Sequence, residues 1–134
     1  MLTNVFTYGS LMFPEVWGRV VRGAYKAAPA SLHGYARFAI VGETYPGMIE
    51  RPGGSVQGIV YFDVDADDLA ALDAFEGADY RRALVDAVLE DSVSAPVATY
   101  LYLPATRLSP CPWLPEAFQM QRFLETYCRD KLGD

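Results

Sequence analysis

The first stretch that constrains the fold is VFTYGSL, residues 5–11. Its aromatic and β-branched residues predict a short strand over positions 5–8, and Gly9-Ser10 predicts a turn where that strand ends. A strand that runs directly into a glycine turn can direct consecutive backbone N–H groups at an anion or a developing oxyanion. An ordinary turn has the same pattern, so this segment alone leaves a binding role and a purely structural role open.

A helix is predicted further along the chain, over residues 65–76. Asp65 is suited to cap its N-terminus, and acidic residues follow in the first turn, where the helix dipole favours negative charge. Gly77 supplies a residue that readily ends a helix. One apolar stripe at i, i+3 and i+6 would face the core, namely Leu69, Leu72 and Phe75.

Glu76 stands at the end of this predicted helix. A negative charge there is disfavoured by about 0.3–1 kcal/mol, which at about 1.36 kcal/mol per unit raises the pKa by roughly 0.2–0.7. Desolvation in a pocket would raise the pKa further, towards the range of a useful general base. The alternative is a solvated glutamate at a frayed helix end. Tyr80 and Arg82 follow closely and are either ordinary strand residues or groups that orient Glu76 and pair with a substrate carboxylate.

The remaining pattern contains more strands than helices. A helix is expected over 14–22, and a final helix over 115–131 follows a proline-rich loop after Pro104. Strands are expected over 30–41, with a break at Gly34, and over 55–64, 82–89 and 97–103, with turns at Tyr45-Pro46-Gly47 and Pro52-Gly53-Gly54. Gly58, inside a strand, indicates a bulge or a close backbone approach. Because the strands do not alternate regularly with helices, we expect an α+β protein with a small closed or half-closed sheet, as one domain over residues 1–134.

Composition narrows the class of function. The 134 residues carry a net charge of −6, which argues against a nucleic-acid groove and a polybasic membrane anchor. No apolar run approaches about 18 residues and no secretory signal opens the sequence, so we expect no membrane segment and a cytoplasmic location with reduced cysteines. His33, Cys111 and Cys128 have no zinc-ligand spacing, so no metal site is expected. His33 is interpreted as a strand or turn residue, which makes a carboxylate the expected base.

The order of the motifs resembles the gamma-glutamylcyclotransferase-like family, in particular its small gamma-glutamylamine cyclotransferase and avirulence-induced-protein-like branch. The resemblance rests on residues 5–11, Tyr45-Pro46-Gly47, residues 56–61 and residues 72–82, and it covers about residues 4–103. It implies a small mixed β-barrel with peripheral helices and a cavity, with Glu76 as the catalytic acid/base. The implied substrate-binding residues are Tyr8, Gly9, Ser10, Leu11, Tyr45, Tyr80 and Arg82. The loop and helix over 104–134 lie outside the resemblance.

The resemblance also implies a reaction. Members of the family release 5-oxoproline from a gamma-glutamyl amine or amide, with the substrate's own α-amine as nucleophile. Such a reaction needs a small-molecule substrate and one proton-carrying carboxylate, but no metal or organic cofactor. Two alternatives stay open: an enzyme that acts on a different amide, and a non-catalytic small-molecule-binding or interaction protein on the same scaffold.

Overall fold

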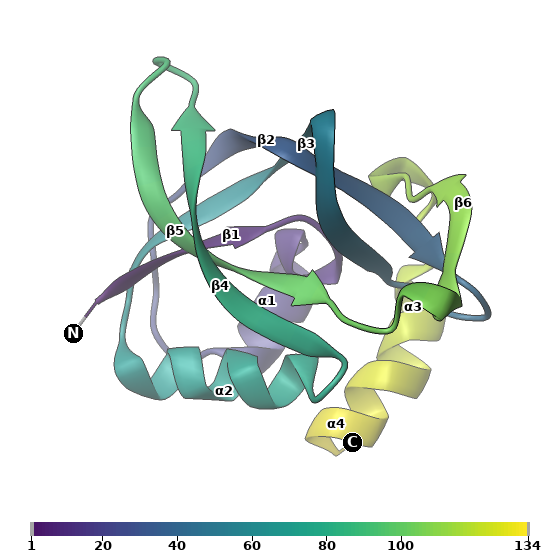
Figure 1. The fold of residues 1–134 in the computed structure, drawn as a ribbon. Helices are drawn as coiled ribbons and strands as arrows, with labels where there is room; N and C mark the ends of the chain where they lie inside the picture. The colour runs from purple at the N-terminus through teal and green to yellow at the C-terminus, as the bar shows by residue number, and fades with distance from the viewer. Residues whose placement is uncertain (1, 134) are drawn as a thin grey trace.

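Five strands close into a barrel in the computed structural model, which describes residues 2–133 (Figure 1). They are β1 (Thr3–Thr7), β2 (Ala27–Ile40), β3 (Pro46–Val64), β4 (Tyr80–Leu89) and β5 (Ser94–Tyr102). Their order is β3-β1-β5-β4-β2, and a long β2–β3 pairing closes the ring. β1 and β5 run parallel and the other pairs are antiparallel. The predicted α+β class and small mixed β-barrel with peripheral helices are confirmed.

The chain builds two apolar clusters, and adjacent residues of β1 belong to different ones, because successive strand side chains point to opposite faces. Phe6 belongs to the cluster that draws on all five strands and therefore fills the barrel, together with Leu32, Met48, Ala87 and Val97. Val5 belongs to the cluster between the barrel and the helices. Gly58 shows the close approach expected of it, since a Cβ there would collide with the Thr7 carbonyl oxygen and the Phe6 ring.

Helices cover one side of the barrel (Figure 1). They are α1 (Pro14–Val20), α2 (Ala66–Glu76) and a C-terminal helix formed by α3 (Met120–Phe123), the π-helical turn η4 (Leu124–Cys128) and α4 (Arg129–Leu132). Asp65 caps α2 as predicted, because its side chain accepts a hydrogen bond from the backbone N–H of Asp68 at 2.8 Å. Gly77 ends α2 with φ +81°. This backbone conformation favours glycine.

The expected turn at Pro52-Gly53-Gly54 lies within β3, and the expected turn at Tyr45-Pro46-Gly47 overlaps the start of that strand, with Tyr45 in the loop before it. Pro46 and Gly47 are the first residues of the strand, and Gly47 lies so close to the Tyr102 ring that a Cβ would be 2.6 Å from it. Pro52-Gly53-Gly54 lies in a bulge, because β2 pairs Tyr35 with Glu50 and His33 with Ser55, which leaves residues 51–54 of β3 unmatched. Gly34 is opposite this bulge with φ +88°, so the expected break in β2 is a local kink within a continuous strand.

The C-terminal part also differs from the expected loop and long helix. A short strand, β6 (Leu108–Pro112), pairs with β2 inside the proline-rich segment. Residues Pro115–Ala117 form a separate 3₁₀ turn, η3, and the C-terminal helix begins only at Met120.

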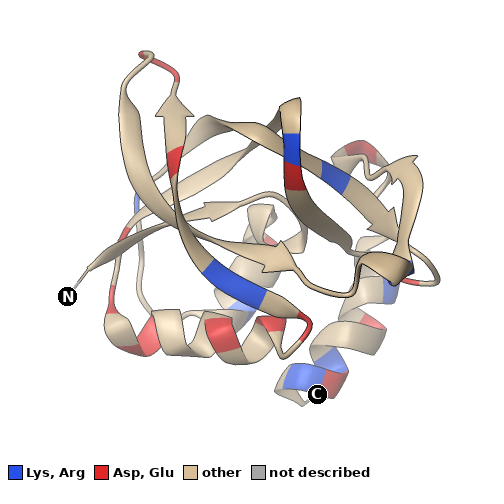
Figure 2. Ribbon diagram, in the orientation of Figure 1, with Lys and Arg blue, Asp and Glu red and all other residues tan. Residues whose placement is uncertain are grey.

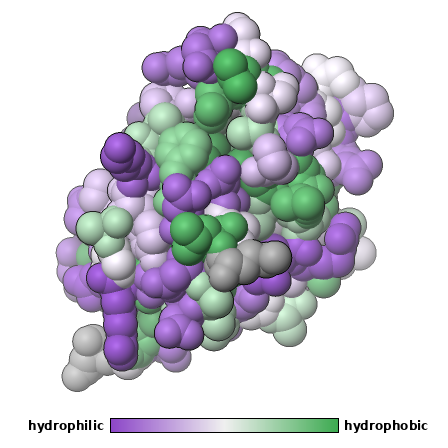
Figure 3. Space-filling view, turned by 90° about the vertical axis from the view of Figure 1, so that its left-hand side faces the viewer, coloured by the Kyte–Doolittle hydropathy of each residue, from purple (hydrophilic) through white to green (hydrophobic). Residues whose placement is uncertain are grey.

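Charge and hydropathy are unevenly spread over the surface. Acidic residues follow α2 along the lower edge of the view, while Lys and Arg residues occur on the C-terminal helix (Figure 2). On the face shown in Figure 3, apolar side chains form several separate groups with polar side chains between them. None of the helices built from residues 2–133 is both long and apolar enough to cross a membrane.

Candidate active site

A pocket lies where the end of β1 meets the C-terminus of α2, with about 410 Å³ of atom-free space including the open solvent at its mouth. The floor is the Tyr8–Leu11 loop, whose Ser10 and Leu11 are buried at the start of the 3₁₀ turn η1 (Ser10–Met12). The first N–H groups of such a turn have no acceptor within it. The loop therefore has backbone donors available for an anionic group.

Glu76 forms part of the opposite wall, because α2 ends there and Gly77 turns the chain away. Burial raises the pKa of its carboxyl group from 4.5 to about 8, opposed by nearby Lys131 and reinforced by nearby Asp73. A group with this pKa exists in both protonation states near neutral pH. Glu76 is thus suited both to take up and to release a proton there.

Five tyrosines surround Glu76 and the loop, and each hydroxyl donates its proton to a protein acceptor. The acceptors of Tyr8 and Tyr80 are the backbone oxygens of Tyr100 and Pro46, at 2.6 and 2.8 Å. The remaining three bonds run from Tyr100 to Asp73 (2.7 Å), from Tyr45 to Glu43 (2.9 Å) and from Tyr127 to the Phe75 backbone oxygen (2.5 Å).

These bonds determine what the tyrosines can offer a ligand. Burial raises the pKa of all five hydroxyl groups, and the charge of Glu76 adds to the rise for Tyr8, Tyr80, Tyr100 and Tyr127, so the groups stay protonated. Each hydroxyl group has one proton, which it already donates to a protein acceptor. It can therefore offer a ligand only a lone pair, which accepts a hydrogen bond. The wall therefore accepts hydrogen bonds, whereas the loop donates them.

Arg37 supports the loop from outside the pocket. Its Nη1 donates to the Tyr8 backbone oxygen at 2.6 Å and to that of Gln57 at 3.2 Å. The guanidinium group lies over the Trp113 ring, 5.3 Å from its centroid. Arg37 thus fixes the peptide between Tyr8 and Gly9, which carries the Gly9 N–H.

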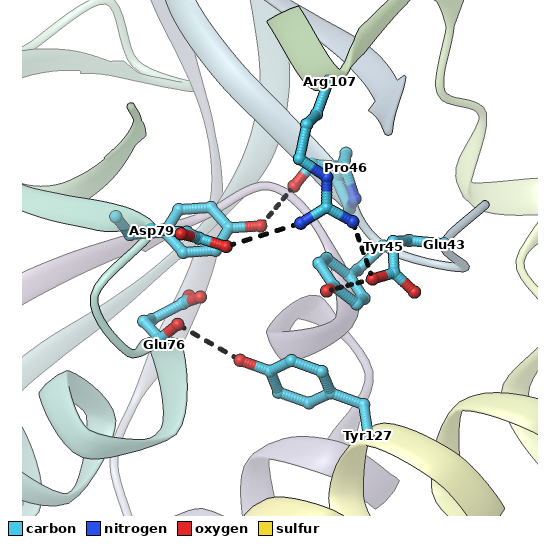
Figure 4. Close-up of polar contacts among 8 residues, drawn as sticks. Glu43, Tyr45, Pro46, Glu76, Asp79, Arg107 and Tyr127 are labelled. Atoms are coloured by element: carbon cyan, nitrogen blue, oxygen red, sulfur yellow. Dashed lines mark hydrogen bonds and ion pairs between the residues drawn. The ribbon is translucent and has the colours of Figure 1, made fainter. Parts of the chain in front are cut away.

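A polar cluster borders the site on the side of Tyr45 (Figure 4). Arg107 stands between two carboxylates, with Nη2 3.4 Å from Glu43 Oε2 and Nη1 3.8 Å from Asp79 Oδ2. All three side chains are at least one-third exposed, so the ion pairs contribute little to stability. Figure 4 also shows Tyr127 reaching from the C-terminal helix to the backbone oxygen of Glu76, at 3.2 Å.

The structure brings together almost all of the residues implied by the resemblance. Glu76, Tyr8, Gly9, Ser10, Leu11, Tyr45 and Tyr80 all line the pocket. Arg82 does not: it lies in a neighbouring depression, where its guanidinium pairs with Asp73 at 2.7 Å. Tyr80 and Arg82 are two residues apart and point to the same face of β4, but Arg82 lies further along the strand, beside Asp73 of α2.

Several wall residues were not identified from the sequence, above all Tyr100 and Tyr127. In the sequence, Tyr100 looks like an ordinary aromatic residue of a strand, and its spacing in β5 carries no further signal. Tyr127 belongs to a helix about 50 residues away from Glu76 along the chain, so only the folded structure places it here. Neither Cys111, which is exposed, nor Cys128, which is buried, lines the pocket. In the part of the chain from 2 to 133, no group of three or more His, Cys, Asp or Glu side chains is arranged to hold a metal ion.

Comparison with known proteins gives a consistent result. The family model described as "Gamma-glutamyl cyclotransferase, AIG2-like" matches residues 5–116. A curated relative, AIG2-like protein A of Arabidopsis thaliana, is 38% identical over 103 residues, which are 76% of this chain and 62% of the relative. The chain thus spans about three-fifths of the length of that relative.

Solved structures agree with the fold. A solution structure of an Arabidopsis thaliana protein superposes with a TM-score of 0.74 at 33% identity, covering 96% of this chain and 90% of that one. A structure named gamma-glutamyl cyclotransferase gives a TM-score of 0.67 at 20% identity over 81% of this chain and 69% of the other, which supports the fold alone.

Proposed function

Since the chain belongs to the gamma-glutamyl cyclotransferase, AIG2-like family, we propose that it releases 5-oxoproline from a gamma-glutamyl amine or amide. The substrate's α-amine attacks its own γ-carbonyl carbon, a new C–N bond closes the five-membered ring, and the bond to the leaving amine breaks. No oxidation or reduction occurs. Overall, two protons pass from the α-ammonium nitrogen, which becomes the lactam N–H, to the leaving nitrogen, which departs as an ammonium ion.

The observation that carries this proposal is the position of Glu76 in a tyrosine-lined pocket opposite the Tyr8–Leu11 loop. The Glu76 carboxylate carries the two protons in turn: it takes one from the α-ammonium group before attack and one from the same nitrogen after attack, and it delivers each to the leaving nitrogen. A pKa of about 8 keeps the two transfers closely balanced in energy. Because ring closure is intramolecular, correct folding of the substrate supplies much of the remaining acceleration.

The polarity of the walls gives the substrate an orientation. The N–H groups of the Tyr8–Leu11 loop hold the substrate carboxylate or the oxyanion of the tetrahedral intermediate. The tyrosine lone pairs and Glu76 face the α-ammonium group, which is a donor. Ser10 acts as a loop donor and not as a nucleophile.

Incubation of the protein with a panel of gamma-glutamyl amines, followed by detection of 5-oxoproline, tests the reaction. We expect Glu76→Gln to fold normally, since it preserves volume, and to lose about 10²–10⁴-fold in kcat. Glu90→Gln, at an exposed residue beyond the end of β4, is the matched control and should keep the wild-type rate. A panel without any product, or a folded Glu76→Gln variant with full activity, would contradict the proposal.

A further inference from the structure

The C-terminal helix completes the pocket although it lies beyond residues 5–116, the part matched by the family model. Tyr127 donates to the backbone oxygens of Phe75 and Glu76, which are among the last carbonyl groups of α2 and have no partner within a helix. One turn later, Lys131 reaches the same place. Its Nζ lies 2.6 Å from the position that a Cβ of Gly77 would take, so the ammonium group rests directly on the turn that follows Glu76.

Lys131 also lies beside Glu76. It lines a shallow depression together with Glu76 and Asp79, just outside the pocket. Its Nζ lies 5.5 Å from the centroid of the Tyr127 ring, on the helix that carries both residues. A cation at this place also interacts favourably with the negative end of the α2 dipole.

We propose that Lys131 is a positioning residue of this site: its ammonium group holds the C-terminal helix on the Glu76–Gly77 turn and stabilises the ionised form of the Glu76 carboxyl. The role deepens the proposed function and rests on it, because it concerns the group that carries the proton.

The charges around Glu76 show why one cation matters. Burial disfavours the carboxylate, and Asp73, one turn earlier on α2, disfavours it further, whereas Lys131 favours it. The other titratable groups that interact with Glu76 are neutral hydroxyl groups from the loop after β1 and from β4, β5 and η4: Tyr8, Tyr80, Tyr100 and Tyr127. Lys131 is the cation within this set. Its removal should therefore raise the pKa of Glu76 and leave less carboxylate at neutral pH.

Lys131→Gln tests the role, with Arg129→Gln as the matched control. Arg129 is an exposed cation two residues earlier on α4, and residues two apart on a helix face different directions. In Lys131→Gln we expect the acidic limb of kcat/KM to move up by roughly 0.5–1 pH unit at low salt. This corresponds to a loss of about three- to tenfold at pH 7 that disappears near pH 9.5. Lys131→Arg should restore most of the activity, and Arg129→Gln should match the wild type.

A second readout does not depend on turnover. The chemical shift of the Glu76 carboxyl carbon, followed by NMR against pH, gives its titration midpoint directly in each variant, with Glu76→Gln to assign the signal. An upward shift in Lys131→Gln alone supports the role. An unmoved midpoint in folded Lys131→Gln, or an equal shift in Arg129→Gln, overturns it. If no gamma-glutamyl compound is turned over, the proposed function fails, while the NMR titration still tests Lys131.

Discussion

Glu76 shows how far a single residue can be understood from its place in the chain. Its position at the end of a helix predicts only a small rise in pKa, because the helix dipole acts through partial charges. The pKa of about 8 comes mainly from burial. Burial arises when β1, β5 and the C-terminal helix close around the carboxyl group, and no local sequence pattern encodes it. The sequence thus identifies Glu76 and the direction of its pKa shift, but not the size of that shift.

The raised pKa of Glu76 has a consequence for stability. Between the ordinary pKa of 4.5 and the folded value of about 8, the unfolded chain loses this proton while the folded protein keeps it. The folded state therefore binds more protons, and its free energy of unfolding falls as the pH rises through this window and levels off above it. Glu76→Gln removes the titration, so we expect its advantage over the wild type to grow from pH 5 to pH 8 by a few kcal/mol.

Urea denaturation at a series of pH values measures this difference. Glu90→Gln, which changes an exposed carboxylate, should follow the wild-type curve throughout. A constant difference between Glu76→Gln and the wild type from pH 5 to pH 8 would show that the Glu76 carboxyl is not desolvated in the folded protein.

Gly9 is required for space. Its φ is negative, at −130°, and a Cβ there would lie 2.9 Å from two atoms of the Pro46 ring. The carbonyl oxygen of Pro46 accepts a hydrogen bond from the Tyr80 hydroxyl. A displaced Pro46 would therefore also move Tyr80, which is part of the pocket wall. We expect Gly9→Ala to lower the free energy of unfolding by about 1–2 kcal/mol and to raise KM severalfold.

Gly18→Ala provides the control for Gly9→Ala. Gly18 lies within α1 with no heavy atom near its Cβ position, so alanine there should stabilise the protein by roughly 0.5–1 kcal/mol. Steady-state kinetics and urea denaturation of both variants make the comparison. Wild-type KM and stability in Gly9→Ala would mean that the contact with Pro46 does not shape the pocket.

At the scale of the elements, local signals in the sequence were reliable where a single residue decides the outcome. The cap at Asp65, the end of α2 at Gly77 and the close approach at Gly58 each follow from one side chain or its absence. The turns at Pro46 and Pro52 were wrong, because the same residues also suit a strand that kinks. Whether a proline–glycine pair ends a strand or bulges within it depends on the partner strand, and here Gly34 of β2 supplies a matching kink.

Asp68 has a larger role than the predicted helix-dipole charge. It is 4% exposed and accepts hydrogen bonds from the Arg22 and Gly23 backbone N–H groups, both at 2.9 Å, and from the Tyr25 hydroxyl at 2.6 Å. It therefore connects α2 by hydrogen bonds to the segment between α1 and β2. Burial by itself would raise its pKa, but these bonds and the nearby Arg22 charge outweigh burial and hold the pKa below its ordinary value of 3.8.

Asp68→Ala should cost about 2–4 kcal/mol, because three donors lose their acceptor in a buried place. Since the folded pKa is lowered, the contribution of Asp68 is present above about pH 4 and is lost as the pH falls below it. Asp67→Ala changes a neighbouring exposed charge and should cost less than about 1 kcal/mol. Thermal denaturation at pH 7 and pH 3 measures both variants; equal losses in the two variants at pH 7 would contradict this connecting role of Asp68.

For the whole molecule, the barrel could be predicted and the outer wall of the pocket could not. The excess of strands and the missing βαβ alternation indicate a small closed or half-closed sheet, the family resemblance implies a mixed barrel, and five strands form it. The sequence contains no such signal for the role of the C-terminal helix. Its two contributing side chains, Tyr127 and Lys131, lie next to α2 only in the folded protein. Residues 104–134 thus supply β6, Tyr127 and Lys131, although the sequence indicates only a loop and a helix there.

Phe123 anchors this helix to the rest of the molecule. Its ring is 1% exposed and contacts Phe75 of α2, Tyr45 of the loop before β3, and Tyr127, with ring centroids 6.3, 6.1 and 5.2 Å away. Phe123→Ala should cost about 3–5 kcal/mol, and the milder Phe123→Leu about 1–1.5 kcal/mol. Because the helix packs on the outside of a barrel that is closed by its own hydrogen bonds, we expect the loss in Phe123→Leu to be greatest in the helix.

Amide hydrogen exchange measures where the stability is lost. In Phe123→Leu, exchange should accelerate more at residues 120–132 than in β1 and β5, and KM should rise because Tyr127 no longer holds its place against Glu76. Leu132→Ala truncates an apolar side chain on the same helix that is 43% exposed, and it should change neither exchange nor KM appreciably. Equal acceleration in helix and barrel would contradict the expectation. It would mean that the helix and barrel unfold as one cooperative unit, so that the outer wall of the pocket cannot open separately from the fold.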